Sequence, residues 1–248
     1  MNSENATLKT MRKPEASSHA ARVSGMFGRI AGRYDFLNHF LSLGMDYFWR
    51  RRLVRMVRMG PTKRVLDLAA GTMDVSLSLV RRYPEAKVLG MDFSMPMLLR
   101  GRDKVRARGE KGVYPVLADG RFLPLPEKSV DCVTIAFGIR NILPRAHAYA
   151  EALRVLTPRG RLCILEFGTG RERIWRGVYN FYLRRILPGL GRIISGDGAA
   201  YRYLADTIKE FPHAEKLAGE LSAAGFDRVM YQPLMSGIVY IHVAEKAP

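Results

Sequence analysis

Three aspartates recur along the first half of the chain, each at the end of a short apolar run. They are Asp67, Asp92 and Asp119. A carboxylate at a strand end can accept hydrogen bonds from a ribose diol or from an exocyclic amino group. Gly71 lies 21 residues before Asp92, and a glycine there lets a tight turn approach a ligand through its backbone. This arrangement predicts a site for a nucleoside.

The turn around Gly71 differs from the glycine-rich loop of dinucleotide-binding proteins. That loop needs three glycines to bring a pyrophosphate onto a helix N-terminus, whereas Ala70 and Met73 occupy two of the positions here. S-adenosylmethionine carries no phosphate, so we predict it as the cofactor rather than a nicotinamide dinucleotide. The three acids, followed by the segments 123–126 and 129–131, resemble the motif series of class I methyltransferases. The predicted cofactor contacts are Asp67, Gly71, Thr72, Asp92, Asp119 and Gly120.

Further segments narrow the resemblance to one family, the C-methyltransferases of ubiquinone and menaquinone biosynthesis. They are residues 34–50, 137–141 (Phe-Gly-Ile-Arg-Asn), 154–160 with 165–167, and 201–208. The resemblance implies methyl transfer to a ring carbon of a reduced 2-polyprenyl benzoquinol or naphthoquinol. The chain departs from the usual family pattern at Ala70, Met73 and Ala136, among others, and we expect Met73 to crowd the methionine end of the cofactor.

Such a reaction needs a proton acceptor, because the ring carbon becomes nucleophilic when its neighbouring hydroxyl is ionised. Arg140 could hold the resulting anionic oxygen or order a water, and Asn141 could fix the other hydroxyl. Asp35 and His39 are the alternative general bases, and imidazole exchanges protons near neutral pH. The predicted catalytic residues are Arg140, Asn141, Asp35 and His39. The predicted substrate contacts are Tyr34, Asn38 and Arg140.

Short apolar strands alternate with amphipathic helices over the middle of the chain. The predicted strands are 64–68, 87–92, 113–119, 131–136 and 161–166, and the predicted helices are 75–83, 95–108 and 146–156. This alternation indicates an α/β fold with a doubly wound parallel sheet. Pro115 favours an edge position for its strand. A helix at 215–223 and strands at 226–231 and 237–244 predict an antiparallel hairpin, giving a Rossmann-like, mostly parallel sheet of seven strands.

We predict a single domain over residues 23–248, in which the remaining segments are additions to the sheet and its helices. An apolar stripe indicates a helix over 23–34, and a second helix is predicted to start after Asp46 as N-cap and to expose Arg50 to water. Residues 23–60 would form a helical cap, residues 1–22 a mobile tail, and residues 170–212 a helical insertion after the fifth strand.

The basic composition bears on partners. Forty Lys and Arg oppose 23 Asp and Glu, for a net charge of +17. A stripe beginning at Trp175 is flanked by arginines, so this segment either lies in a membrane interface or covers the active site. We therefore expect, besides the lipid-tailed quinol, a peripheral contact with anionic lipid at the inner face of the cell membrane. Cys132 and Cys163 lie in apolar runs, in agreement with a cytoplasmic location.

Two other functions stay open at this stage. One is a class I methyltransferase acting on RNA or another small molecule, which the charge favours. The sequence lacks a base-flipping motif or added RNA-binding module, so no nucleic-acid partner is expected. The other is a non-catalytic basic protein that binds membranes or nucleic acid. The histidines show no ligand spacing, so no metal is expected. The ring type, the tail length and the oligomeric state, including a homo-oligomer, are left open.

Overall fold

The computed structural model describes residues 34–168 and 206–248, together with positions 23, 25, 26, 28, 32 and 203. This part of the chain forms one seven-stranded sheet in the order β3-β2-β1-β4-β5-β7-β6. The strands are β1 (Arg64–Leu68), β2 (Lys87–Asp92), β3 (Val113–Leu117), β4 (Val130–Ala136), β5 (Leu156–Phe167), β6 (Arg228–Leu234) and β7 (Val239–Glu245). Strands β1 to β5 are parallel, and β7 runs antiparallel between β5 and β6. The predicted fold class is confirmed.

The strand order explains where a ligand can bind. The chain moves outward from β1 through β2 to β3 and then returns to place β4 on the other side of β1. A crevice forms where the winding direction reverses, at the carboxyl ends of β1 and β4. Strand β3 is the edge strand, as Pro115 predicted, because a residue without an N–H group is tolerated there.

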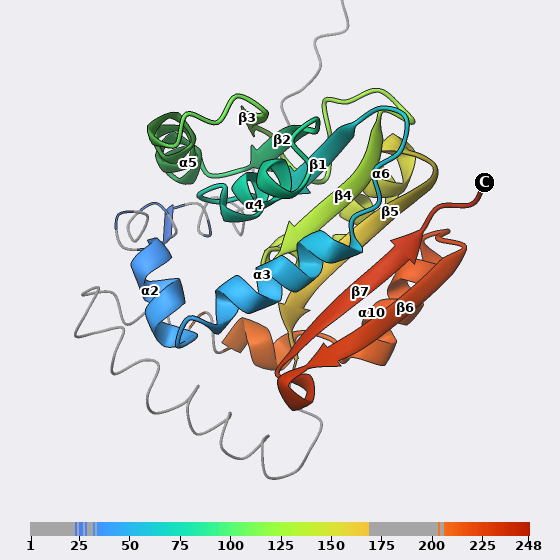
Figure 1. Cartoon of the computed structure of the whole chain (residues 1–248). Coiled ribbons are helices and arrows are strands. Elements are labelled where there is room, and N and C mark those ends of the chain that lie inside the picture. The colour runs from blue at the N-terminus through green and yellow to red at the C-terminus, as the bar shows by residue number, and fades with distance from the viewer. Residues whose placement is uncertain are drawn as a thin grey trace, which may run out of the picture.

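Helices cover both faces of the sheet (Figure 1). One face packs against α3 (Met45–Met56), α4 (Asp74–Arg82) and α5 (Met95–Ala107), and the other against α6 (Arg145–Val155) and α10 (Ala214–Ala223). Successive strand residues alternate between the two cores, so Val65 joins the first core and Leu66 the second. The shorter elements are α2 (Tyr34–Leu41) and the 3-10 turns η1 (Ile139–Asn141) and η3 (Met235–Gly237).

The start of α3 differs from the prediction. The helix begins at Met45, and its N-cap is Gly44, which takes the left-handed conformation with φ 76°. Asp46 is therefore not the cap: it is buried in the first turn and accepts a hydrogen bond from Arg50 at 2.8 Å. The prediction that Arg50 faces water is wrong for the same reason, since its guanidinium turns inward to the Asp46 carboxylate.

Several predicted segments lie wholly or mostly outside the residues that the structure describes. The tail at 1–22, the stripe from Trp175 and nearly all of the insertion at 170–212 lie outside the described residues, and their predictions remain untested. Positions 23, 25, 26 and 28 are helical, in agreement with the stripe that begins at Val23. Among the described helices, none has the length and apolar character needed to cross a membrane.

Candidate functional site

Asp92 connects the carboxyl ends of the neighbouring strands β1 and β2. Its Oδ2 accepts a hydrogen bond from the Gly71 backbone N–H at 2.8 Å, and its Oδ1 accepts one from the Ser94 N–H at 2.8 Å. Burial raises the pKa of the Asp92 carboxyl, and these backbone hydrogen bonds oppose the rise. The carboxylate therefore fixes the turn after β1 against the end of β2, where a ribose would be recognised.

The other two predicted acids already have protein partners. Asp67 is buried and accepts hydrogen bonds from Ser76 at 2.6 Å and Thr134 at 2.9 Å, and burial raises its pKa to about 6. The Arg121 Nε donates to both carboxylate oxygens of Asp119, and its Nη2 donates to Oδ2 at 2.6 Å. Partial burial acts to raise the pKa of Asp119, but the Arg121 hydrogen bonds lower it overall. Cofactor contacts by Asp67 and Asp119 remain predictions.

Crowding of the cofactor by Met73 stays a prediction. Its side chain is fully buried, and it fills the space above two glycines of neighbouring elements. A Cβ added at Gly90 of β2 would lie 2.3 Å from the Met73 Sδ, and one at Gly101 of α5 would lie 2.6 Å from its Cγ. The large residue is accommodated inside the core, although its backbone takes the left-handed conformation with φ 68°.

Replacing Met73 by glycine is expected to destabilise the protein by about 2 kcal/mol. Removing a buried side chain of this size costs about 2–5 kcal/mol, and releasing the left-handed strain returns only about 1 kcal/mol. Urea unfolding of the variant beside the wild type measures the difference. A variant as stable as the wild type would show that the methionine does not pack as the contacts with Gly90 and Gly101 indicate.

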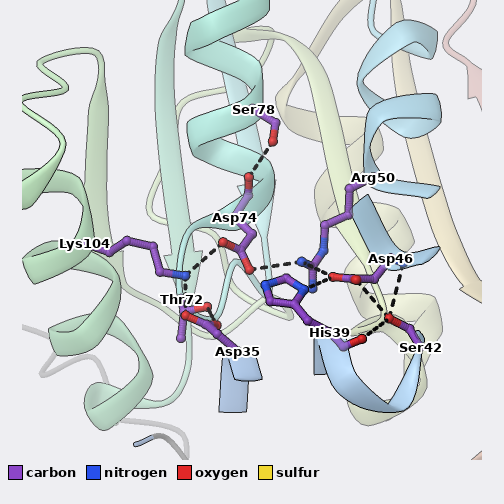
Figure 2. Close-up of polar contacts among 9 residues, drawn as sticks. All are labelled: Asp35, His39, Ser42, Asp46, Arg50, Thr72, Asp74, Ser78 and Lys104. Atoms are coloured by element: carbon purple, nitrogen blue, oxygen red, sulfur yellow. Dashed lines mark hydrogen bonds and ion pairs between the residues drawn. The ribbon is translucent and has the colours of Figure 1, made fainter. Parts of the chain in front are cut away.

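A network of charged side chains joins α2 to the turn after β1, residues 69–73, which is the predicted cofactor turn (Figure 2). Asp35 accepts a hydrogen bond from the Thr72 hydroxyl and pairs with the Lys104 Nζ at 2.5 Å. The same Nζ lies 2.9 Å from Asp74 Oδ1 at the start of α4. Lys104 thus holds α2, α4 and α5 together through two carboxylates.

The network continues from α4 to α3. Arg50 Nη1 lies 3.0 Å from Asp74 Oδ2 and 2.8 Å from Asp46 Oδ2, and the latter oxygen lies 2.6 Å from His39 Nδ1. The His39 ring stacks on Tyr47 with 4.1 Å between centroids. The structure thus connects Asp35, Thr72 and His39, three predicted site residues, through Lys104, Asp74, Arg50 and Asp46, which sequence reasoning did not select.

Replacing Lys104 by methionine should destabilise the protein by about 1–2 kcal/mol at neutral pH, because Asp35 loses its cation and Asp74 keeps only Arg50. Burial acts to raise the pKa of Asp74, but Arg50 and Lys104 lower it overall. A lowered pKa stabilises the fold above the unfolded value of about 3.9, and this contribution is lost as pH falls through the folded value. The Tm difference between wild type and variant should therefore shrink from pH 7 towards pH 3.

The matched control is Lys63→Met, since Lys63 is 54% exposed and its nearest carboxylate oxygen, on Glu85, is 3.8 Å away. This control should leave the Tm unchanged. A Tm difference for Lys104→Met that stays constant with pH would contradict the assignment of its stabilisation to ionised carboxylates.

A second charged pair lies at the end of β4. Arg140, in η1, is buried and places its Nη1 2.6 Å from Glu166 Oε1 on β5 and 2.6 Å from the Phe137 carbonyl oxygen. Burial raises the pKa of Glu166, and the charge of Arg140 opposes the rise. The segment before η1 reaches the predicted cofactor turn, since a Cβ added at Gly138 would lie 2.5 Å from the Ala69 Cβ. Sequence reasoning proposed Arg140 without its partner Glu166.

Aromatic rings surround this pair. The Arg140 guanidinium lies 5.6 Å from the centroid of Phe167, which packs against Phe137 at 4.6 Å and Trp49 at 6.3 Å. Three buried polar atoms here have no hydrogen-bond partner among the described residues: Arg140 Nε, Glu166 Oε2 and Trp49 Nε1. Buried polar groups are normally satisfied, so this apolar region has unused capacity to bind a polar ligand or water.

The other predicted residues take varied positions. Asn141 accepts a hydrogen bond from Tyr203 at 3.1 Å, which joins two of the segments that carry the family resemblance. Gly120 is closely packed, since an added Cβ would lie 3.1 Å from Ile142. Asn38 is half-buried on α2. Tyr34 begins α2, but its side chain is outside the described residues.

The geometry can now be compared with known proteins. The ubiE/COQ5 methyltransferase family matches residues 15–246. The chain belongs to this family. A demethylmenaquinone methyltransferase of Thermus thermophilus is 46% identical over 221 residues, covering 89% of this chain and 100% of that protein. A ubiquinone/menaquinone biosynthesis C-methyltransferase UbiE of Geobacter sulfurreducens is 43% identical over 227 residues, covering 91% of this chain and 88% of that protein.

Solved structures support the fold of the family member. A SAM-dependent methyltransferase of Thermotoga maritima superposes with a TM-score of 0.64 at 17% identity, over 90% of this chain and 98% of that one. A phosphoethanolamine N-methyltransferase of Haemonchus contortus, in complex with S-adenosyl-L-methionine, gives a TM-score of 0.60 at 13% identity, over 94% and 59%. At such identities the likeness concerns the fold alone.

Proposed function

We propose that this protein transfers a methyl group from S-adenosylmethionine to a ring carbon of a reduced polyprenyl quinone precursor, a demethylmenaquinol, a 2-polyprenyl benzoquinol or both. The observation that carries the proposal is the buried Arg140–Glu166 pair, which has unused hydrogen-bonding atoms and lies next to the cofactor turn. Relatives that are named as methyltransferases of quinone biosynthesis align with the chain over most of its length, which supports the same proposal.

The residues at the ends of β1 and β2 suit the cofactor. Asp92 offers a carboxylate that can accept hydrogen bonds from a ribose. It lies beside the turn at Gly71, where the backbone can approach the ligand closely. Among the described residues, only the Met97 Cε, at 3.5 Å, lies within 4 Å of a Cβ added at Gly71. When bound, S-adenosylmethionine supplies an electrophilic methyl group. The protein contributes by holding the methyl group and the ring carbon in the orientation that the reaction needs, which can supply much of the rate enhancement.

We assign Arg140 to the ionised hydroxyl of the acceptor ring. A guanidinium is a donor that stabilises an anionic oxygen but does not take its proton. The ion pair with Glu166 holds Arg140 in place, and its Nε remains available because it has no partner among the described residues. Phe137, Phe167 and Trp49 provide the apolar surroundings in which such an interaction is strong.

Of the two alternative bases, the contacts favour His39. Asp35 is already bonded to Thr72 and Lys104 through its two carboxyl oxygens. Among the described residues, His39 uses only its Nδ1, on Asp46, and an imidazole whose Nδ1–H is held by a carboxylate leaves its Nε2 as a proton acceptor. We therefore propose His39 as the general base. We further propose that the enzyme works in the cytoplasm at the inner face of the cell membrane, since a polyprenyl tail keeps the substrate in the bilayer.

The direct test is methylation by the purified protein. Incubation with S-adenosylmethionine and a chemically reduced demethylmenaquinone should give the methylated ring by mass spectrometry, and the oxidised quinone should give none because it has no hydroxyl to ionise. A 2-polyprenyl benzoquinol is tested in parallel. Cofactor binding by calorimetry without product from either ring would contradict the substrate class, and no cofactor binding would contradict the whole proposal.

A further inference from the structure

Five of the thirteen large apolar side chains that are exposed among the described residues lie close together in the sequence. They are Phe36 (58% exposed), Phe40 (44%), Leu43 (89%), Tyr47 (61%) and Phe48 (45%). All five lie within thirteen consecutive residues, on α2, on the turn after it and on the first turn of α3. We call this surface the α2–α3 apolar face. Apolar residues that are scattered singly need no explanation, but a cluster of this kind indicates a binding surface.

The charged network explains how the face stays outside the core. The side chains of Asp35 and His39 on α2 are half-buried. Both bond to other parts of the protein, as Figure 2 shows. Phe36 and Phe40 project from the same helix but stay exposed and stack on each other at 5.8 Å. The ion pairs of Asp35 and His39 therefore attach α2 to the domain, and the rings of Phe36 and Phe40 stay exposed.

Leu43 is the clearest sign that this exposure has a function. Its backbone is left-handed, with φ 51°, and its side chain is 89% exposed. Because the side chain is exposed, a leucine here gains no free energy from burial. Glycine or asparagine would also fit the left-handed backbone better. Neither the fold nor solubility favours an apolar side chain at this position, so the physical reason for it lies in a contact outside the described structure.

Charge identifies the partner. Arg51 and Arg55 follow Tyr47 at intervals of four residues, so they lie on the same side of α3. Both are exposed, and neither has an ion pair with any described residue. Arg52 lies with its guanidinium carbon 5.6 Å from the Phe48 ring centroid. Exposed aromatic and leucine side chains bordered by free arginines match the interface of an anionic lipid bilayer.

We infer that the α2–α3 apolar face docks the enzyme on an anionic bilayer, with Leu43 and the phenylalanines in the interface and Arg51 and Arg55 on the headgroups. The inference rests on the proposed function, which requires a substrate held in a bilayer. It places the membrane contact on the helices that carry the proposed base His39, which brings the site close to the lipid-tailed substrate.

The test is co-sedimentation of the full chain with vesicles of phosphatidylcholine alone or mixed with phosphatidylglycerol. The wild type should bind only the mixed vesicles, and less as salt is added. Leu43→Asn should weaken binding about tenfold, the effect of withdrawing one leucine from the interface, at an equal or higher Tm. Met230→Thr is the control, since Met230 is 51% exposed on the edge strand β6, and it should bind like the wild type. Arg51→Gln with Arg55→Gln should reduce the preference for anionic lipid.

Other outcomes would overturn the inference: no vesicle binding by the wild type, equal binding by Leu43→Asn, or a wild-type dimer that Leu43→Asn dissociates, which would make the face a subunit interface. Turnover of a short-tailed quinol in solution separates this inference from the proposed function. Leu43→Asn should keep wild-type turnover there. Loss of vesicle binding with that turnover intact supports docking, whereas a wild type that binds vesicles but never methylates a quinol leaves docking supported and contradicts the proposed function.

Discussion

Replacing Arg140 by alanine is expected to lower kcat by about 10²–10³-fold while cofactor affinity stays close to that of the wild type. This is the usual effect of removing one preorganised donor that stabilises a developing anionic oxygen. Arg140→Lys should recover only part of the rate, because an ammonium cannot keep the Phe137 carbonyl, Glu166 and a ligand together as the planar guanidinium can. Turnover of a reduced quinol and cofactor titration on the same samples measure both quantities.

The structure adds a control for stability. Glu166 is 1% exposed, so Arg140→Ala leaves a buried carboxyl without its cation, and this should lower the Tm. Adding Glu166→Gln to Arg140→Ala removes that charge and should restore much of the Tm. A catalytic Arg140 requires that turnover stays low in the double variant. If turnover returned together with the Tm, Arg140 would be structural and the assignment would be wrong.

The elements of the sheet could be predicted because their signals are local. Each strand of the parallel core is a short apolar run, and each helix between strands has an amphipathic period, so the first four strands were found within two residues of their observed bounds. Strand β5 starts at Leu156, five residues before the predicted start, and the strands of the closing hairpin lie one to three residues further along the chain than predicted. Pro115 even indicated the edge of the sheet, since the loss of one N–H group has the same consequence wherever the strand lies.

The partners inside the site could not be predicted, because they depend on register across the sheet. Arg140 and Glu166 are 26 residues apart in sequence and meet only because β4 and β5 are adjacent, with Ala136 opposite Leu165. Lys104 was part of a predicted helix with many basic residues, and nothing in the sequence distinguished it from its exposed neighbours. Its two carboxylates come from α2 and α4.

One missed interaction did have a local signal. Asp46 and Arg50 are four residues apart, the spacing of an ion pair on a helix, but this spacing does not say whether the pair faces water or the protein. The turn at Gly44 decides the matter, since its left-handed backbone ends the preceding turn and places Asp46 inside. A glycine before an acidic residue is common enough in loops that the sequence alone could not separate the two arrangements.

Asp92→Ala is expected to weaken S-adenosylmethionine binding by about ten- to a hundredfold, since a hydrogen bond between a carboxylate and a ribose contributes on the order of 1.5–3 kcal/mol. Part of the loss should be indirect, because the variant also frees the Gly71 N–H and with it the turn. Burial raises the pKa of Asp92, so the carboxylate takes up its proton at a higher pH than an exposed aspartate. Wild-type affinity should therefore begin to fall early on acidification, whereas the affinity of the Asp92→Ala variant should lack this decline.

Calorimetric titration across pH separates recognition by Asp92 from a general loosening of the fold. Asp103→Ala is the control, because Asp103 lies on α5 with a side chain that is 66% exposed. That variant should bind the cofactor as the wild type does at every pH. An Asp92→Ala protein that is folded, as shown by its Tm, and binds with wild-type affinity would remove the carboxylate from the site. The Gly71 turn would then have to recognise the ligand by its backbone alone.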